Sequence, residues 1–146
     1  MYRFFMANNL TFSIIKPDAV SRHITGKINS MIENAGFSIV AQKLIRITKE
    51  QAQKFYDVHQ DKPFYEDLCN YISSGAVVVQ VLKKENAVAD YRKLMGATNP
   101  ANAEEGTIRK KYAISIDQNS VHGSDAEDTA EREISFFFSK TELVGC

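Results

Sequence analysis

The run Ala76-Val-Val-Val-Gln-Val-Leu82 constrains the fold of this chain more than any other segment. It is apolar at nearly every position and rich in β-branched residues, which favour strands. A near-continuous apolar run of this length is typical of a strand at the centre of a sheet, whereas a strand with one solvated face alternates. We therefore expect a sheet that is organised around residues 76–82.

The spacing of apolar residues predicts the elements on either side of this strand. Further strands are expected at residues 10–16, at 37–47 and in a short segment that ends at Val121. Helices are expected at residues 24–35, from 49 to about 59, at 64–73, at 86–95 and from 124 to 138. Thr48 with Gln51, and Ser124 with Glu127, form capping-box patterns at two of the helix starts. This order lacks the regular βαβ repeat of a doubly wound sheet. It favours an α+β, ferredoxin-like (β-α-β-β-α-β) fold, with a four-stranded antiparallel sheet and helices over one face.

Composition narrows the functional classes. The 146 residues include 18 basic and 18 acidic side chains, so a formal net charge of zero gives no overall case for binding nucleic acid or an anionic membrane. Cys69 and Cys146 suit neither a disulfide framework nor a zinc site, which favours a reducing cytoplasm. No stretch approaches the roughly 18 apolar residues of a membrane span. We expect one domain over residues 1–146, with residues 1–9 as an extension and Met6 as a second candidate start.

His122 is a candidate catalytic residue, because it lies just before the helix predicted to begin at Ser124. Backbone N–H groups at a helix N-terminus favour an anion, and a neutral imidazole beside an anion can accept a phosphoryl group. A surface histidine beside a capping turn is the alternative, and for a lone histidine the commoner one. Lys16, at the end of the first strand, is either a functional side chain or a charge that closes the strand.

Residues 97–118 form an irregular segment of about 20 residues, which in a domain of this size indicates a functional loop or an unrecognised element. Arg109, Lys110 and Lys111 form the densest basic cluster of the chain, with a solvated loop tip as the alternative. Thr25-Gly26-Lys27 lacks the upstream glycine and the following Ser or Thr of a phosphate-binding P-loop, so that motif is excluded.

Six fragments, in the right order, make residues 10–144 similar to the nucleoside diphosphate kinase family. They are Ile15-Lys-Pro-Asp18, Asp61-Lys-Pro-Phe64, Ser74-Gly75, Gly96-Ala-Thr-Asn-Pro100, Gly106-Thr-Ile-Arg109, and Asn119-Ser-Val-His-Gly-Ser-Asp125 with Glu133-Ile134. The resemblance implies a ferredoxin-like fold and an enzyme that moves the γ-phosphoryl group of a nucleoside triphosphate onto a histidine, then onto a nucleoside diphosphate. The position that matches this histidine is His122, and the reaction would be reversible and ping-pong.

The resemblance also implies a role for each matching residue. Glu133 would orient the imidazole with the support of Ser124, and Tyr56 would lie close to the transferred group. Lys16 and Asn119 would hold the ribose hydroxyls, and Arg92, Thr98 and Arg109 would bind the phosphates. Phe64 would stack on the base, with Leu68 and Ile116 lining its pocket. Because stacking reads no hydrogen-bonding edge, we expect low base specificity.

Mg²⁺ is the cofactor that the resemblance implies. It would arrive on the nucleotide phosphates without a direct protein ligand, and Asp125 is the nearest candidate for a water-mediated contact. The chain departs from the family pattern at Ala76, where proline is common, and at its end, because Cys146 precedes the tail that longer members use in subunit contacts. A homo-oligomer is therefore expected, as a hexamer or a tetramer.

A function of another class remains as the alternative: a ferredoxin-like binding or regulatory module that uses the nucleotide pocket, or the Lys110 and Lys111 patch, without turnover. The joint presence of His122, its candidate partner Glu133 and the phosphate-binding candidates favours the enzyme, because a binding protein needs no nucleophile.

Overall fold

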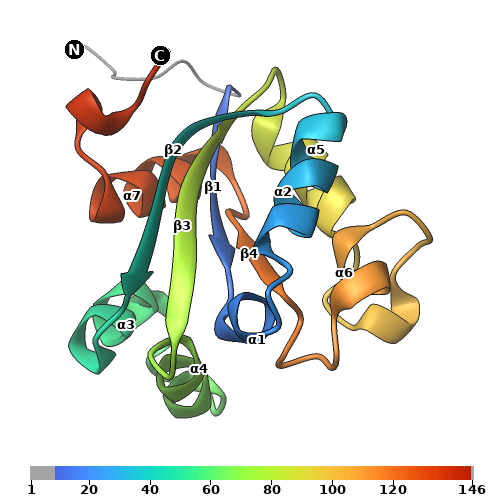
Figure 1. The fold of residues 1–146 in the computed structure, drawn as a ribbon. Helices are drawn as coiled ribbons and strands as arrows, with labels where there is room; N and C mark the ends of the chain where they lie inside the picture. The colour runs from blue at the N-terminus through green and yellow to red at the C-terminus, as the bar shows by residue number, and fades with distance from the viewer. Residues whose placement is uncertain (1–8, 146) are drawn as a thin grey trace.

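A computed structural model describes residues 9–145, and its centre is a four-stranded antiparallel sheet (Figure 1). The strands are β1 (Leu10–Ile15), β2 (Ser38–Arg46), β3 (Ala76–Lys83) and β4 (Val121–Gly123). They lie in the order β2-β3-β1-β4, so β3 is central, as its apolar run predicted. The predicted α+β, ferredoxin-like architecture is confirmed. The predictions for the N-terminal extension and for Cys146 fall outside the described residues, apart from Asn9.

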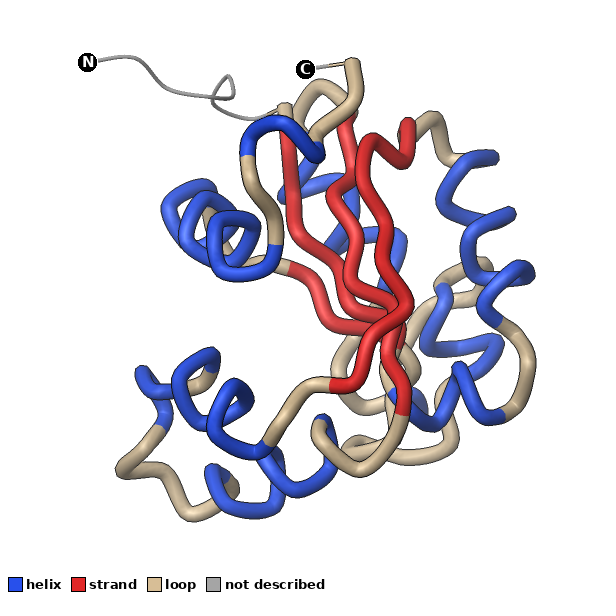
Figure 2. Tube along the Cα trace, turned by 60° about the vertical axis from the view of Figure 1, so that its left-hand side comes forward, coloured by secondary structure: helices blue, strands red, loops and turns tan. Residues whose placement is uncertain are grey.

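Helices cover both faces of the sheet, which Figure 2 shows with the strands between two helical layers. The helices are α1 (Pro17–Ser21), α2 (Thr25–Asn34), α3 (Lys49–Phe55), α4 (Tyr65–Ile72), α5 (Ala87–Met95), α6 (Ile108–Tyr112) and α7 (Glu127–Phe137). Short 3-10 turns lie at Asp57–His59, Pro100–Asn102 and Lys140–Glu142. None of the helices in residues 9–145 is both long and apolar enough to cross a membrane.

Two apolar clusters explain why the helices divide between the faces. Phe12 and Ile14 of β1 join the cluster that includes side chains of α3, α4 and α7, whereas Ile15 joins the cluster with α2, α5 and α6. β3 alternates in the same way, with Val79 in the first cluster and Val78 in the second. The apolar run of β3 is therefore continuous because both faces are buried. The expectation of helices over one face was too narrow.

The helix predicted to begin at Ser124 begins three residues later, because the Ser124 hydroxyl forms hydrogen bonds with groups outside the helix start. α7 starts at Glu127, and its N-cap residue Ala126 has no side-chain cap. The Ser124 hydroxyl instead donates to Glu133 Oε1 (2.7 Å) and accepts a hydrogen bond from the backbone N–H of Phe12 (3.4 Å). The predicted Ser124 capping box is thus wrong, whereas both hydrogen bonds of the capping box at Thr48 are present.

Two short helices were not predicted. α1 begins at Pro17, directly after β1, and α6 lies within the segment 97–118 that was expected to be irregular. The helix expected to reach residue 59 ends as an α-helix at Phe55 and continues as a 3-10 turn. Both unpredicted helices are five residues long, too short to show a helical period in the sequence.

Candidate active site

His122 lies inside β4, one residue beyond the predicted strand end, with Ile14 of β1 opposite it. Its side chain is 19% exposed. The rings of Phe12, Phe55 and Tyr56 surround the imidazole, with centroids 6.2, 5.7 and 6.4 Å from its own. This aromatic wall leaves the imidazole few orientations.

Glu133, on α7, contacts the ring of His122. Nε2 of His122 lies 3.0 Å from Glu133 Oε1, and Ser124 Oγ donates to the same oxygen at 2.7 Å. A carboxylate accepts, so Nε2 carries the proton, and in the neutral ring Nδ1 carries the free lone pair. α7 packs against β1, the neighbour of β4 in the sheet, and this brings Glu133 to His122.

Glu133 is almost fully buried, and its surroundings keep it ionised. Burial acts to raise the pKa of Glu133. The charge of His122 and its hydrogen bond, together with the hydrogen bond from Ser124 and the charge of Arg132, outweigh burial and hold this pKa below its usual value. The carboxylate is thus available to stabilise positive charge on the imidazole.

Lys16 and Asn119 form a buried pair beside this group. Lys16 follows β1, is 7% exposed, and donates from Nζ to Asn119 Oδ1 at 2.9 Å. Burial and then the charge of Arg109 lower the pKa of Lys16 to about 8, against the opposing charges of Asp18 and Asp117. A charge that only closes a strand would lie in solvent, so the structure favours the functional interpretation of Lys16.

Arg109 lies on α6 and is buried, unlike its neighbours Lys110 and Lys111. It donates to the carbonyl oxygens of Gly96 (3.0 Å) and Val121 (2.8 Å), while its buried Nε has no partner. Burial lowers the pKa of Arg109; Tyr91 opposes this shift and Arg92 adds to it. The predicted basic cluster therefore divides into one buried arginine at the site and two exposed lysines.

Arg92 is an exposed side chain of α5, and its partner is Asp125: Arg92 Nη1 lies 2.7 Å from Asp125 Oδ1. The Asp125 side chain is 76% exposed. Arg109 donates to Gly96 at the end of α5, the helix that carries Arg92, and α5 contacts α6, so the two arginines lie on neighbouring elements.

Two glycines allow these elements to approach closely. A Cβ on Gly96, which has a φ of +85°, would lie 2.5 Å from Thr107 Oγ1. A Cβ on Gly123 would lie 2.7 Å from Met95 Cε and 2.8 Å from Tyr91 Cδ2. Larger residues would move α6 away from α5 in the first case and β4 away from α5 in the second.

Three of the residues predicted to bind the nucleotide lie at the surface. Phe64 is 49% exposed with its ring centroid 5.6 Å from that of His59, Ile116 is 53% exposed, and Thr98 is exposed. Leu68, on α4, is half-buried against the apolar cluster that includes Phe12 and Ile14. Within residues 9–145, no hydrogen bond or ring contact joins these four side chains to His122.

Sequence reasoning missed residues that pack against the candidate site residues or fix the backbone next to them. They include Phe12 and Phe55 beside the imidazole, and Ser120, whose φ is +76°. One signal was available: a proline directly after Lys16 is typical of a first helical position and could have revealed α1.

The side chains of the site are compatible with a metal ion that is bound mainly by the nucleotide phosphates and not by a dedicated set of protein ligands. In residues 9–145, no group of three or more His, Cys, Asp or Glu residues could hold a metal ion. Asp125 offers one exposed carboxylate, and Mg²⁺ at phosphates commonly needs only one or two carboxylates with its waters.

Comparison with known proteins assigns the family. The family model described as "Nucleoside diphosphate kinase" matches residues 9–143. The chain belongs to the nucleoside diphosphate kinase family. Two proteins named nucleoside diphosphate kinase, from Rhodovulum sulfidophilum and from Chelativorans sp. (strain BNC1), are 61% and 58% identical to it over 140 residues, which is 96% of this chain and 100% of each relative.

Two solved structures share the fold. The nucleoside diphosphate kinase of Aquifex aeolicus superposes with a TM-score of 0.91 and 38% identity, over 92% of this chain and 98% of that one. The halophilic nucleoside diphosphate kinase of Halobacterium salinarum, in complex with CDP, gives 0.90 and 41% over 95% and 93%. The chain is therefore a phosphotransferase that reversibly moves the γ-phosphate of a nucleoside triphosphate to a nucleoside diphosphate, by the family's ping-pong phosphohistidine mechanism.

Proposed function

We propose that His122 is the residue that carries the phosphoryl group between the two nucleotides. The observation that carries this proposal is the 3.0 Å contact between Nε2 and Glu133 Oε1, next to an aromatic wall. It holds the imidazole in the tautomer whose Nδ1 can attack, and it places a carboxylate where positive charge develops.

The transfer takes place in two balanced halves. The Nδ1 lone pair forms a bond to the γ-phosphorus while the bond from that phosphorus to the bridging oxygen breaks, and the electron pair leaves on the nucleoside diphosphate. The phosphorylated imidazole is cationic, and Glu133 stabilises it through the Nε2 proton. In the second half, a terminal phosphate oxygen of the acceptor nucleoside diphosphate forms a bond to the phosphorus while the Nδ1–P bond breaks, and its electron pair returns to Nδ1, so the imidazole becomes neutral again.

The cations and polar groups around His122 bind and orient the nucleotide in this proposal. Arg92, Thr98 and Arg109 bind the phosphates, and Lys16 and Asn119 hold the ribose hydroxyls. The Lys16–Asn119 pair is already formed in the free protein, which supports this role. Burial, followed by the charge of Glu133, raises the pKa of Tyr56, so its hydroxyl stays protonated as a donor near the transferred group.

Phe64 stacks on the base, and Leu68 and Ile116 line the pocket around it. The exposure of Phe64 and Ile116 supports this role, since the free energy falls when a ligand covers a large apolar side chain that was exposed to water. Stacking without edge recognition gives low base specificity. Mg²⁺ would be held by the nucleotide phosphates and reach Asp125 through water, and when bound it neutralises phosphate charge.

The proposal extends to where the protein works and how it assembles. We infer that it works in the cytoplasm as a single-domain subunit of a homo-oligomer, a tetramer or a hexamer, without a membrane partner; its sequence gives no case for nucleic acid. Leu44, on the edge strand β2, is 68% exposed, which supports a surface that a second subunit covers. Light scattering after size exclusion distinguishes a monomer, a tetramer and a hexamer.

The role of His122 is tested by incubation with Mg²⁺ and ATP labelled in its γ-phosphate, without acceptor. The protein should acquire an acid-labile, alkali-stable phosphate that added GDP removes. His122→Asn should not be labelled, whereas the matched control His23→Asn, at an exposed histidine, should be labelled like the wild type. Equal labelling of wild type and His122→Asn would refute the assignment. Nucleotide binding without any labelling of the wild type would favour the binding module.

A further inference from the structure

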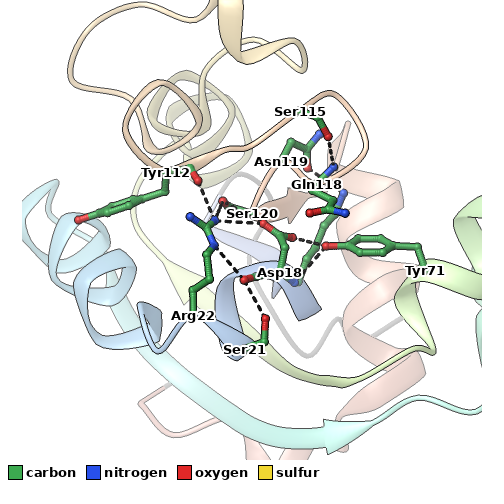
Figure 3. A network of polar contacts seen from close by, with 10 residues as sticks. Asp18, Ser21, Arg22, Tyr71, Tyr112, Ser115, Gln118, Asn119 and Ser120 are labelled. Atoms are coloured by element: carbon green, nitrogen blue, oxygen red, sulfur yellow. Dashed lines mark hydrogen bonds and ion pairs between the residues drawn. The ribbon is translucent and has the colours of Figure 1, made fainter.

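Figure 3 shows a cluster of polar groups around the buried Asp18 carboxylate, which the phosphoryl transfer itself does not use. We call it the Asp18 cluster; its members are Asp18, Arg22, Tyr71 and Ser120. The Asp18 side chain is only 3% exposed. Burial of a carboxylate is costly unless it is paired and hydrogen-bonded, so these partners are needed to hold it there.

The Asp18 carboxylate connects four parts of the chain. The Tyr71 hydroxyl, on α4, donates to Asp18 Oδ1 and accepts the backbone N–H of Asp18 at 3.0 Å. Arg22 Nη2 lies 3.3 Å and Ser120 Oγ 3.4 Å from Asp18 Oδ2. Arg22 Nη2 also donates to the carbonyl oxygen of Tyr112, the last residue of α6, at 2.7 Å. Asp18 thus joins α1 to α4, to the end of α6 and to the residue before β4.

Ser120 occupies a backbone conformation that needs such support. It is fully buried, with a φ of +76°, and the N–H of Val121 donates across it to the carbonyl oxygen of Asn119 at 2.9 Å. This is a γ-turn with positive φ, which is rare and strained for a residue with a side chain. Strained conformations persist only where the surrounding contacts fix them.

The γ-turn determines where two site residues lie. Asn119, on one side of Ser120, accepts the hydrogen bond from Lys16 Nζ, and His122 follows two residues after Ser120. The carbonyl oxygen of Ser120 also accepts the backbone N–H of Lys16 at 2.9 Å. A change at Ser120 would therefore move the Lys16–Asn119 pair relative to the imidazole.

We propose that Asp18 is a positioning residue for phosphoryl transfer, which holds the γ-turn at Ser120 and thereby aligns the Lys16–Asn119 pair with His122. This inference rests on the proposed function of those three residues. Asp18 does not touch the nucleotide and acts only through Ser120 and Lys16.

Charge gives Asp18 a second effect on Lys16. The charged groups that face Lys16 are Arg109 from α6, Asp18 from α1 and Asp117 from the loop before β4. Burial and Arg109 lower the pKa of Lys16 to about 8, and the two carboxylates oppose this. Around Asp18 itself, Arg22 adds positive charge, while burial and the hydrogen bond to Asp18 raise the pKa of Tyr71 and keep it a donor. Without the Asp18 charge, the pKa of Lys16 falls further.

The first test is Asp18→Asn, which keeps the shape and removes the charge. An NMR titration of the Lys16 side chain should show its midpoint about half a pH unit or more below that of the wild type. The alkaline limb of kcat/KM should move in the same direction, with kcat about tenfold lower. Asp90→Asn is the matched control, because Asp90 pairs with Lys84 away from the site; it should shift neither quantity. An unchanged Lys16 midpoint together with unchanged kcat in folded Asp18→Asn would overturn the proposal.

The second test separates geometry from charge. Tyr71→Phe and Ser120→Ala each remove one hydroxyl partner and leave the Asp18 charge in place. Both should lower kcat while the Lys16 midpoint stays close to that of the wild type, and these variants decide the matter if Asp18→Asn does not fold. Wild-type kcat in both, with only a lower Tm, would overturn the proposal. If instead the wild type showed no His122-dependent labelling, the proposed function itself would fail, which is a distinct result.

Discussion

The two sides of the candidate site are built differently. We call His122, Glu133, Lys16 and Arg109 the inner wall; each is largely buried and has partners within the chain. We call Phe64, Arg92, Thr98 and Ile116 the outer rim; all four are exposed. Arg92 forms an ion pair with Asp125, and this pair is also exposed to solvent.

This difference indicates a division of work. Groups held by internal hydrogen bonds do not need to reorganise as charge develops, which is the condition for stabilising a transition state. Exposed side chains become ordered only when the ligand covers them, so they contribute mainly to binding. Changes in the inner wall should therefore lower kcat, and changes in the outer rim should mainly raise KM.

Among changes that leave His122 in place, Glu133→Gln in the inner wall should have the largest effect on turnover. The amide keeps the shape but no longer offers a charge to the imidazole when it becomes cationic, so kcat should fall about 100-fold or more. Stopped-flow measurement of phosphorylation and dephosphorylation of His122 gives the two half-reactions separately. A fall in affinity for nucleotide at unchanged kcat would contradict the division between wall and rim.

The same variant tests the electrostatics of the inner wall. The pKa of Glu133 is lower in the folded protein than its usual value, so its ionised form stabilises the fold above that usual value. This stabilisation is lost as the pH falls through the lowered pKa. Glu133→Gln should therefore flatten the loss of stability in acid, as measured by denaturant unfolding at several pH values.

The inner wall also shows where sequence reasoning stops. The apolar run of β3 and the spacing of the helices predicted the fold class, because burial on a sheet face leaves a periodic pattern. Ser124 with Glu127 had the pattern of a cap, yet the hydroxyl of Ser124 binds Glu133, nine residues away. A local pattern cannot report a competing tertiary partner.

Site residues were assigned by resemblance because their contacts are long-range. Lys16 and Asn119 are 103 positions apart, and no property of either segment alone indicates their pairing. Ser120 gave no sign of its positive φ, since that conformation depends on Asp18 and Lys16. The rim residues were likewise assigned by resemblance, since no local pattern in the sequence marks them as ligand-binding.

Lys16→Met should have the second-largest effect. Loss of a charged hydrogen-bonding group at the ligand should reduce kcat/KM by about 10- to 100-fold at neutral pH. In the wild type, kcat/KM should fall above a pH of about 8 as Lys16 loses its proton, and the variant should lack this limb. An alkaline limb that persists unchanged in Lys16→Met would assign it to another group.

Lys16→Met should also change how the free energy of unfolding depends on pH. Because burial lowers the pKa of Lys16 to about 8 from 10.5, the folded protein binds this proton less tightly than the unfolded chain. The contribution of Lys16 to the free energy of unfolding should therefore rise with pH between these values. In Lys16→Met this rise should be absent, which denaturant unfolding at several pH values between about 8 and 10.5 would measure.

Phe64→Ala tests the rim. Base stacking contributes on the order of 1–3 kcal/mol, so KM should rise about tenfold for every nucleotide while kcat changes little. Parallel assays with purine and pyrimidine nucleotides provide the measurement, and Val58→Ala, at another exposed apolar residue, is the control. A large loss for one base only would show that Phe64 reads the base rather than stacking on it.

Asp125→Asn should have the smallest effect. Its carboxylate is 76% exposed, and exposed ion pairs contribute at most about 1 kcal/mol, so freeing Arg92 should change KM for ATP by no more than about fivefold. Salt gives the decisive comparison, because it screens an exposed pair far more than a buried one. The variant and the wild type should converge as ionic strength rises, whereas the deficit of Glu133→Gln should remain. If Asp125→Asn instead lowers kcat strongly at saturating Mg²⁺, Asp125 belongs functionally to the inner wall, and exposure would be a poor guide to the division between the two sides.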